Sequence, residues 1–134
     1  MISKATDSFT QRIWMAGNYA NAEEICRTFC EQGMCVSISP ANYIYTSGEE
    51  AGFVVTLINY ARFPKDPVFL KDLAFCLALD LMNGLHQQSF SIEGPEETLF
   101  FSKRPEDEQK AMSETDRCPY CGKPGPPCFN CSKP

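Results

Sequence analysis

The segment "AGFVVTLINYARF", Ala51 to Phe63, decides the fold because it ends in a motif that the chain has already used once. Its first part is rich in β-branched and aromatic residues and predicts a strand. Its end contains Asn59-Tyr60-Ala61, which repeats the Asn18-Tyr19-Ala20 that follows the shorter apolar run "RIWMAG" at 12–17. A motif that follows two predicted strands in the same way indicates that one structural unit occurs twice.

Each copy of the motif leads into a predicted helix. After the first copy, Asn21 and Glu24 have the form of a capping box, and Gly33 is placed to end the helix. After the second copy, Asp66 can cap the helix and Pro67 can take its first turn, where a missing N–H costs nothing. The two predicted units therefore begin in the same order, strand and then helix.

Both units then end in related segments, "CVSISPANYIYT" at 35–46 and "SFSIEGPEETLFF" at 89–101. They share a Ser-Ile pair, a proline and a pair of large apolar residues in the same order. The first segment predicts either a tight hairpin at Pro40 or one strand interrupted there. Two tandem β-α-β units predict an α+β, ferredoxin-like βαββαβ sandwich at 1–104. A charged linker at 105–117 and a cysteine-rich tail at 118–134 follow it.

In this arrangement we expect the two motif-bearing loops to emerge at the same end of the sheet, beside both helix N-termini. Exposed N–H groups there attract anions, and the guanidinium of Arg62 suits a phosphate or a carboxylate. The two tyrosines suit stacking on a base. The structural alternative is that asparagine and tyrosine only serve the turns and caps. The predicted site for a small anionic nucleotide-like ligand comprises Asn18, Tyr19, Asn21, Asn59, Tyr60, Arg62 and Lys65.

Carboxylate pairs at two predicted turns, Glu49-Glu50 and Glu96-Glu97, are the other candidates for chemistry. Solvated hairpin tips are commonly acidic, and adjacent residues on a strand point apart. An enzyme acting on a nucleotide would need Glu49 or Glu50 beside the loops. His86 is the sole histidine, and the chain contains no motif for an activated nucleophile. The sequence therefore favours a non-enzymatic protein that acts by binding.

The tail carries the most specific chemical signal, a C-x2-C-x6-C-x2-C pattern formed by Cys118, Cys121, Cys128 and Cys131. Four thiolates at this spacing predict a tetrahedral, structural Zn²⁺ site in a small zinc knuckle. The other cysteines, Cys26, Cys30, Cys35 and Cys76, lie in apolar periodic segments and are expected to be buried, inert thiols.

Net charge and hydropathy limit the partners. The chain of 134 residues has a formal net charge of −5 and a pI near 4.8, which argues against direct nucleic-acid binding. No apolar run is long enough to span a bilayer, so we expect a cytoplasmic protein without a membrane partner. The helix predicted to start at Pro67 is apolar around most of its circumference, which predicts that part of it is buried in a homodimer or against a partner.

The core pattern "YIYTSGEEAGFVVTLINYARFP" resembles small accessory proteins of tailed bacteriophages over residues 13–101. The resemblance implies action against a host system, in the anti-CRISPR or another anti-defence class, in the cytoplasm of the host cell. The resulting expectation is a phage-type accessory protein that sequesters a small anionic nucleotide-like ligand. The alternatives are an inhibitor that occludes a host protein through its acidic surface and zinc knuckle, or a nucleotide-processing enzyme.

Overall fold

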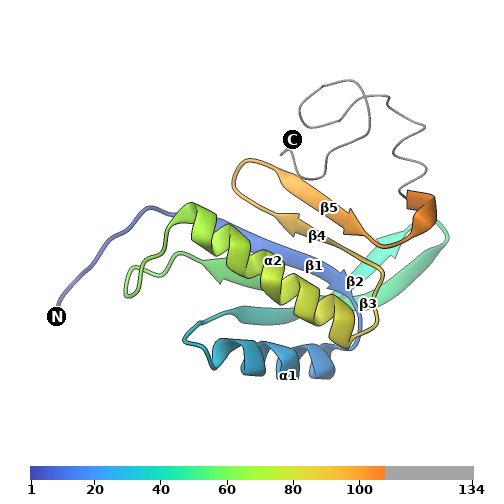
Figure 1. The fold of residues 1–134 in the computed structure, drawn as a ribbon, viewed down its shortest axis with the longest axis horizontal. Coiled ribbons are helices and arrows are strands. Elements are labelled where there is room, and N and C mark those ends of the chain that lie inside the picture. Colours follow the sequence, from blue (N-terminus) through green and yellow to red (C-terminus); the bar gives the residue numbers. More distant parts are fainter. Residues whose placement is uncertain (108–134) are drawn as a thin grey trace.

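A computed structural model of the protein describes residues 1–107 as one five-stranded sheet with two helices packed on the same face (Figure 1). The expected α+β class is confirmed. The predicted zinc ligands of the tail lie outside the described residues, so the zinc site stays a prediction. The elements are β1 (Thr10–Ala16), α1 (Tyr19–Cys30), β2 (Ser37–Tyr45), β3 (Gly48–Ile58), α2 (Pro67–Gly84), β4 (Ser89–Glu93) and β5 (Thr98–Ser102).

The strand order is β2-β3-β1-β4-β5, and every neighbouring pair is antiparallel. The two expected β-α-β units are present as β1-α1-β2 and β3-α2-β4. Each unit receives a strand of the other between its own two strands, because β3 pairs with β1 and β1 pairs with β4. Strand β5 adds to the edge of the second unit.

The pairing of β1 with β3 corrects one expectation about the site. Thr10 lies opposite Ile58, and Ala16 lies opposite Gly52. Because the two strands run in opposite directions, the loop after β1 and the loop after β3 leave the sheet at opposite ends. The expectation that both motif-bearing loops emerge at one end is therefore wrong.

The two proline-containing segments fold differently despite their similar sequences. Strand β2 continues through Pro40, which lies opposite Phe53, so the alternative of a hairpin at Pro40 is wrong. Because β2 is an edge strand, the missing N–H of proline leaves no partner unpaired in a neighbouring strand. In the second segment, Pro95 lies in the turn between β4 and β5, which form a hairpin.

Both helices begin with a side-chain cap. Asn18, and not the predicted Asn21, is the N-cap of α1, and its Oδ1 accepts a hydrogen bond from the Asn21 backbone N–H at 2.9 Å. Asp66 caps α2 as predicted, accepting from the Val68 N–H at 3.0 Å, and Pro67 is the first helical residue. Each helix N-terminus thus satisfies N–H groups within the chain, which weakens it as a site for anions.

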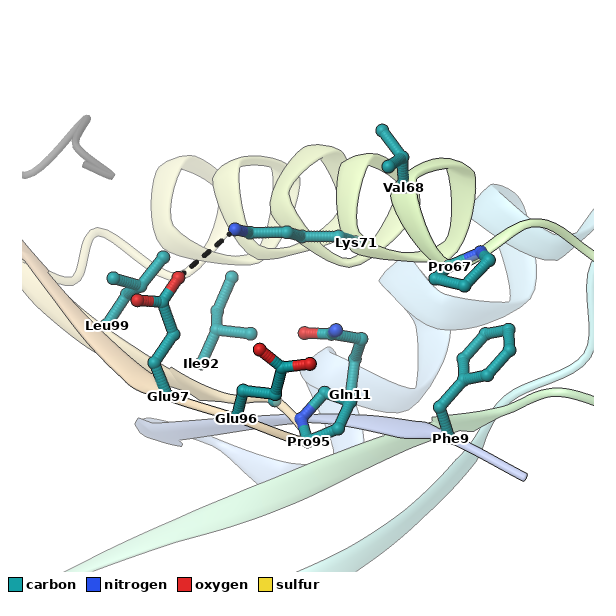
Figure 2. A pocket seen from close by; sticks show the side chains of 11 residues that line it. Phe9, Gln11, Pro67, Val68, Lys71, Ile92, Pro95, Glu96, Glu97 and Leu99 are labelled. Carbon is teal, nitrogen blue, oxygen red and sulfur yellow. Dashed lines mark hydrogen bonds and ion pairs between the residues drawn. The ribbon is translucent and has the colours of Figure 1, made fainter. Parts of the chain in front are cut away.

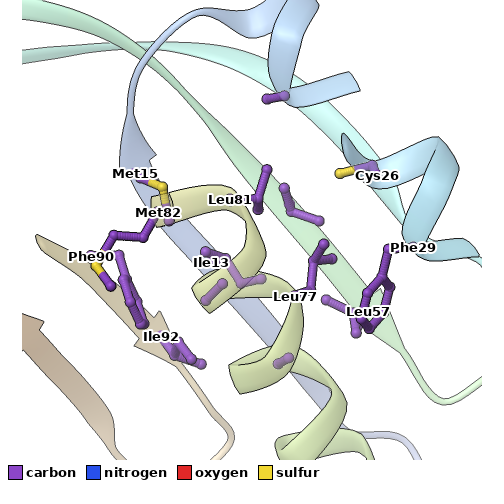
Figure 3. Close-up of a cluster of buried hydrophobic side chains, with 14 of the residues drawn as sticks. Ile13, Met15, Cys26, Phe29, Leu57, Leu77, Leu81, Met82, Phe90 and Ile92 are labelled. Atoms are coloured by element: carbon purple, nitrogen blue, oxygen red, sulfur yellow. The ribbon is translucent and has the colours of Figure 1, made fainter. Parts of the chain in front are cut away.

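The core lies between the sheet and the two helices (Figure 3). Alternate residues of β1 and β3 face inward, and Ile13, Phe53 and Leu57 have no exposed surface. Helix α2 contributes Leu77 and Leu81, which are also fully buried. Complete burial of side chains of this size stabilises the fold by about 2 kcal/mol each relative to exposure.

The remaining face of α2 carries large apolar side chains. Val68, Phe69 and Phe75 are 65%, 51% and 37% exposed. Residues 1–107 contain no helix with the combination of length and apolar character needed to cross a membrane. The homodimer expected from this helix stays a prediction.

The four cysteines of the described region do not all share the expected environment. Burial, helped by the nearby Cys30 thiol, raises the pKa of Cys26 to about 11, which suits an inert, protonated side chain. Cys30 is partly buried, whereas Cys35 and Cys76 are exposed. The expectation of burial is thus wrong for the last two, because Cys35 lies in the connection after α1 and Cys76 on the outer side of α2.

Candidate functional site

The predicted ligand residues fall into two groups at opposite ends of the sheet. The first group, Asn18, Tyr19 and Asn21, lies at the N-terminus of α1. There the Asn18 side chain is used as a cap, and the Tyr19 hydroxyl donates to the Ile38 carbonyl at 3.2 Å. These contacts match the structural alternative for this part of the predicted site.

The second group lies between β3 and α2, where Asn59 has a structural role. Its side chain is 8% exposed. The amide Nδ2 donates to the Thr6 hydroxyl at 3.1 Å and to the Asp7 carbonyl at 2.8 Å, while Oδ1 accepts from the Lys65 N–H at 2.7 Å. Asn59 thereby fastens the N-terminal segment to the loop that leads into α2.

Replacing Asn59 with Ala should lower the free energy of unfolding by about 2 kcal/mol, because buried groups lose hydrogen-bond partners. Asn42→Ala is the control, since it removes an exposed hydrogen bond to Glu49 and should cost less than about 0.5 kcal/mol. Urea denaturation followed by circular dichroism measures both. Equal stability of the two variants would contradict the anchoring role of Asn59.

The other members of this group are partly engaged as well. Tyr60 packs against Phe63 with ring centroids 5.3 Å apart, and hydrogen bonding with the Cys35 side chain, together with desolvation, raises the pKa of Tyr60 to about 12. The Lys65 ammonium lies 5.7 Å from the centre of the Phe63 ring. Arg62 is exposed and forms no ion pair within residues 1–107.

A pocket of about 440 Å³ lies near this second group, between the first turns of α2, the start of β1 and the β4–β5 turn (Figure 2). This volume is in the range of pockets that bind small molecules. Three segments far apart in the sequence build it. Its lining consists of Phe9, Gln11, Pro67, Val68, Lys71, Ile92, Gly94, Pro95, Glu96, Glu97 and Leu99.

Gln11 is the most unusual residue of this lining. It is only 5% exposed, and its side-chain amide has no hydrogen-bond partner within residues 1–107. Figure 2 shows this amide directed into the pocket, below Lys71. A buried amide without a partner costs about 1–3 kcal/mol, so it marks a place where another molecule can complete the bonding.

The charges at the pocket do not cancel. Lys71 Nζ pairs with Glu97 Oε2 at 3.3 Å, a contact between half-exposed side chains that is worth less than about 1 kcal/mol. Glu96 forms no ion pair in the described part of the chain, and its carboxylate points into the pocket (Figure 2). As far as the described residues show, the pocket therefore combines apolar walls, a carboxylate without an ion pair and an amide without a hydrogen-bond partner, a set that suits a cationic ligand with a hydrogen-bonding ring.

The other acidic pair lies at the far end of the sheet. Glu49 and Glu50 stand at the start of β3, and Glu49 Oε1 accepts a hydrogen bond from Asn42 at 2.9 Å. They are near the loop that follows β1, since the Gly17 N–H donates to the Ala51 carbonyl at 3.2 Å. The two acidic turns, which look alike in sequence, therefore have separate surroundings.

The prediction from sequence missed Gln11, although a signal for it exists. Gln11 lies two residues before Ile13 and four before Met15, so strand alternation places it on the inward face. A polar residue in a row of inward-facing apolar ones is informative, because buried polar groups need partners. Glu96 was considered only as part of an acidic hairpin tip.

Comparison with known proteins gives a match in fold and none in sequence. No family model matches the chain, and no curated protein sequence matches it. Among solved structures, a phage SAM lyase in its apo state matches with a TM-score of 0.59 and 15% identity, over 78% of this chain and 97% of that chain. A phage SAM lyase in complex with S-methyl-5'-thioadenosine matches with a TM-score of 0.57 and 15% identity, over 76% of this chain and 95% of that chain.

These matches correct the functional expectation. At 15% identity they establish a shared fold, and that fold is the one of a phage enzyme. The prediction of a non-enzymatic protein that acts by binding is therefore wrong, and the comparison favours the alternative of a nucleotide-processing enzyme. The resemblance to phage proteins is confirmed at the level of fold, and one of the matched structures holds a nucleoside.

Proposed function

We propose that this chain is an enzyme that cleaves S-adenosylmethionine and releases S-methyl-5'-thioadenosine. The observation that carries the proposal is the fold, which this chain shares over 78% of its length with a phage SAM lyase. One of the two matched structures contains S-methyl-5'-thioadenosine, the nucleoside expected from such a cleavage. The candidate substrate site is the pocket between β1, α2 and the β4–β5 turn.

The proposed reaction balances within the substrate. The bond between the sulfonium sulfur and the aminobutyrate carbon breaks, and its electron pair goes to sulfur, which becomes a neutral thioether. The substrate's own carboxylate forms a bond to the released carbon and closes a five-membered lactone. The step consumes no water, no oxidant and no protein nucleophile, so it does not need an activated side chain.

The pocket suits this reaction in two respects. The Glu96 carboxylate offers a counter-charge for the cationic substrate, while the apolar side chains of Phe9, Ile92 and Leu99 form much of the wall. The reaction neutralises a sulfonium and a carboxylate, and a low-dielectric wall favours a transition state with less charge than the ground state. The chain's role is then to bind and fold the substrate rather than to exchange protons with it.

The test is to incubate the purified full chain with S-adenosylmethionine and to quantify S-methyl-5'-thioadenosine by liquid chromatography and mass spectrometry. A parallel incubation without protein corrects for spontaneous breakdown of the sulfonium. We expect nucleoside to form at a rate proportional to protein concentration, together with the lactone. A rate equal to that of the protein-free sample would overturn the proposed function.

Three further assignments belong with this proposal. The order of β1 to β4 and the two helices support a ferredoxin-like arrangement of residues 1–104, extended by β5. The exposed apolar side chains of α2 support a homodimer, which sedimentation equilibrium tests. The four cysteines of the tail support one Zn²⁺ per chain, which native mass spectrometry tests.

A further inference from the structure

We infer that Gln11 recognises the adenine base of the bound nucleoside, and that Gly94 keeps open the space in which the base meets the Gln11 amide. The identity of the ligand rests on the proposed function. The inference itself starts from a separate feature, the buried amide that has no partner within residues 1–107.

The position of Gln11 fits recognition better than packing. Its neighbours on the inward face of β1 are the buried apolar residues Ile13 and Met15, so an apolar side chain would suit the same row. The amide instead points into the pocket, on the side where Glu96 also points (Figure 2). A polar group that is buried, unpaired and directed into a cavity obtains its hydrogen-bond partner from the molecule that occupies the cavity.

The chemistry of the amide selects among bases. A glutamine side chain presents one acceptor and one donor side by side, which matches the N6 amino group and the N7 atom of adenine. Hypoxanthine carries a carbonyl oxygen in place of the amino group. On the edge formed by O6 and N7, hypoxanthine presents two acceptors, so a glutamine can form only one of the two hydrogen bonds there and the pocket should prefer adenine.

Gly94 stands directly beside this amide. A Cβ at position 94 would lie 3.2 Å from Gln11 Nε2 and 3.3 Å from Gln11 Oε1. The Gly94 N–H donates to the Glu97 carbonyl at 2.9 Å, so the turn holds the residue in place. Its φ is not positive, and alanine is therefore compatible with the backbone but would crowd the amide.

Two variants separate recognition from a structural role. Gln11→Met keeps the length of the side chain and removes both hydrogen-bonding atoms, and Gly94→Ala keeps Gln11 and narrows the space beside its amide. Because the amide has no hydrogen-bond partner among residues 1–107, Gln11→Met should leave the melting temperature unchanged or raise it. If the Gln11 amide formed hydrogen bonds within the protein, the same substitution would lower the melting temperature.

Isothermal titration of each protein with S-methyl-5'-thioadenosine and with its inosine analogue tests the inference. We expect the wild type to bind the adenine compound at least about 10-fold more tightly than the inosine compound. Gln11→Met should lose about 10- to 100-fold in affinity for the adenine compound and retain little discrimination, and Gly94→Ala should shift in the same direction. Unchanged affinity and discrimination in Gln11→Met would overturn the inference, as would a wild type that binds neither compound.

A cleavage assay with S-adenosylmethionine on the same samples separates a failure of the proposed function from a failure of the role of Gln11. Cleavage by a wild type that does not discriminate between the bases would leave the proposed function standing and overturn the role of Gln11. The wild type could instead bind the adenine compound selectively, lose this selectivity in Gln11→Met, and show no cleavage. That result would support the nucleoside site and overturn the proposed reaction.

Discussion

Gly52→Ala should lower the free energy of unfolding by about 3 kcal/mol and the melting temperature by about 10 °C. This free-energy change is at the upper end of the usual range for substitutions that overpack a core. Gly52 lies opposite Ala16 in the pairing of β3 with β1, the central strand of the sheet. A Cβ there would collide with the Met15 carbonyl oxygen and would lie 2.8 Å from the Ala16 Cα. These are backbone atoms, so relief requires the two strands to move apart.

The matched control is Gly84→Ala, the same chemical change at the end of α2. A Cβ at this position would meet the Ile25 Cδ1 atom at 2.7 Å, which is the far end of a flexible side chain. Because alanine also favours a helix over glycine, the net change should be within about 1 kcal/mol. Thermal unfolding by circular dichroism measures both variants, and equal melting temperatures would contradict the tight pairing of β1 with β3.

Glu96→Gln should raise the KM for S-adenosylmethionine by about 10- to 50-fold, because the substrate loses its counter-charge in the pocket. The value of kcat should change by less than about threefold. The sulfonium charge disappears as the carbon–sulfur bond breaks, so an attraction to that charge stabilises the bound substrate at least as much as the transition state. Steady-state kinetics of the nucleoside product gives both constants.

Glu49→Gln is the control for this prediction, since Glu49 lies at the start of β3, at the opposite end of the sheet, and accepts a hydrogen bond from the Asn42 side chain. Its kinetic constants should remain within about twofold of the wild type. If Glu49→Gln loses activity and Glu96→Gln does not, the substrate site belongs at the other acidic turn.

The local signals in the sequence predicted the elements well. Asp66 and Pro67 marked the start of α2, and the β-branched run before Asn59 marked β3. Both signals are local, because a capping residue or a strand-forming residue influences only the backbone a few positions away. The repeated order of strand and helix also predicted the two β-α-β units. Those features depend on residues close together in the chain.

The errors concern relations between distant segments. Pro40 and Pro95 follow similar Ser-Ile pairs, yet one lies within an edge strand and the other in a turn, and position in the sheet decides between them. Likewise, the ends at which two loops emerge depend on whether their strands are parallel. The pocket joins Phe9 and Gln11 to α2 and to the β4–β5 turn, a combination that no local pattern contains.

The most direct test of this account is an NMR titration of the ¹⁵N-labelled full chain with S-methyl-5'-thioadenosine. If the nucleoside binds in this pocket, the largest chemical-shift changes fall on the Gln11 side-chain NH₂ group and on the backbone amides of Gly94, Glu96 and Lys71. Changes that centre instead on Asn18, Tyr19 and Glu50, at the opposite end of the sheet, would contradict the placement of the nucleoside. A spectrum that does not change at millimolar nucleoside would contradict the nucleoside site altogether.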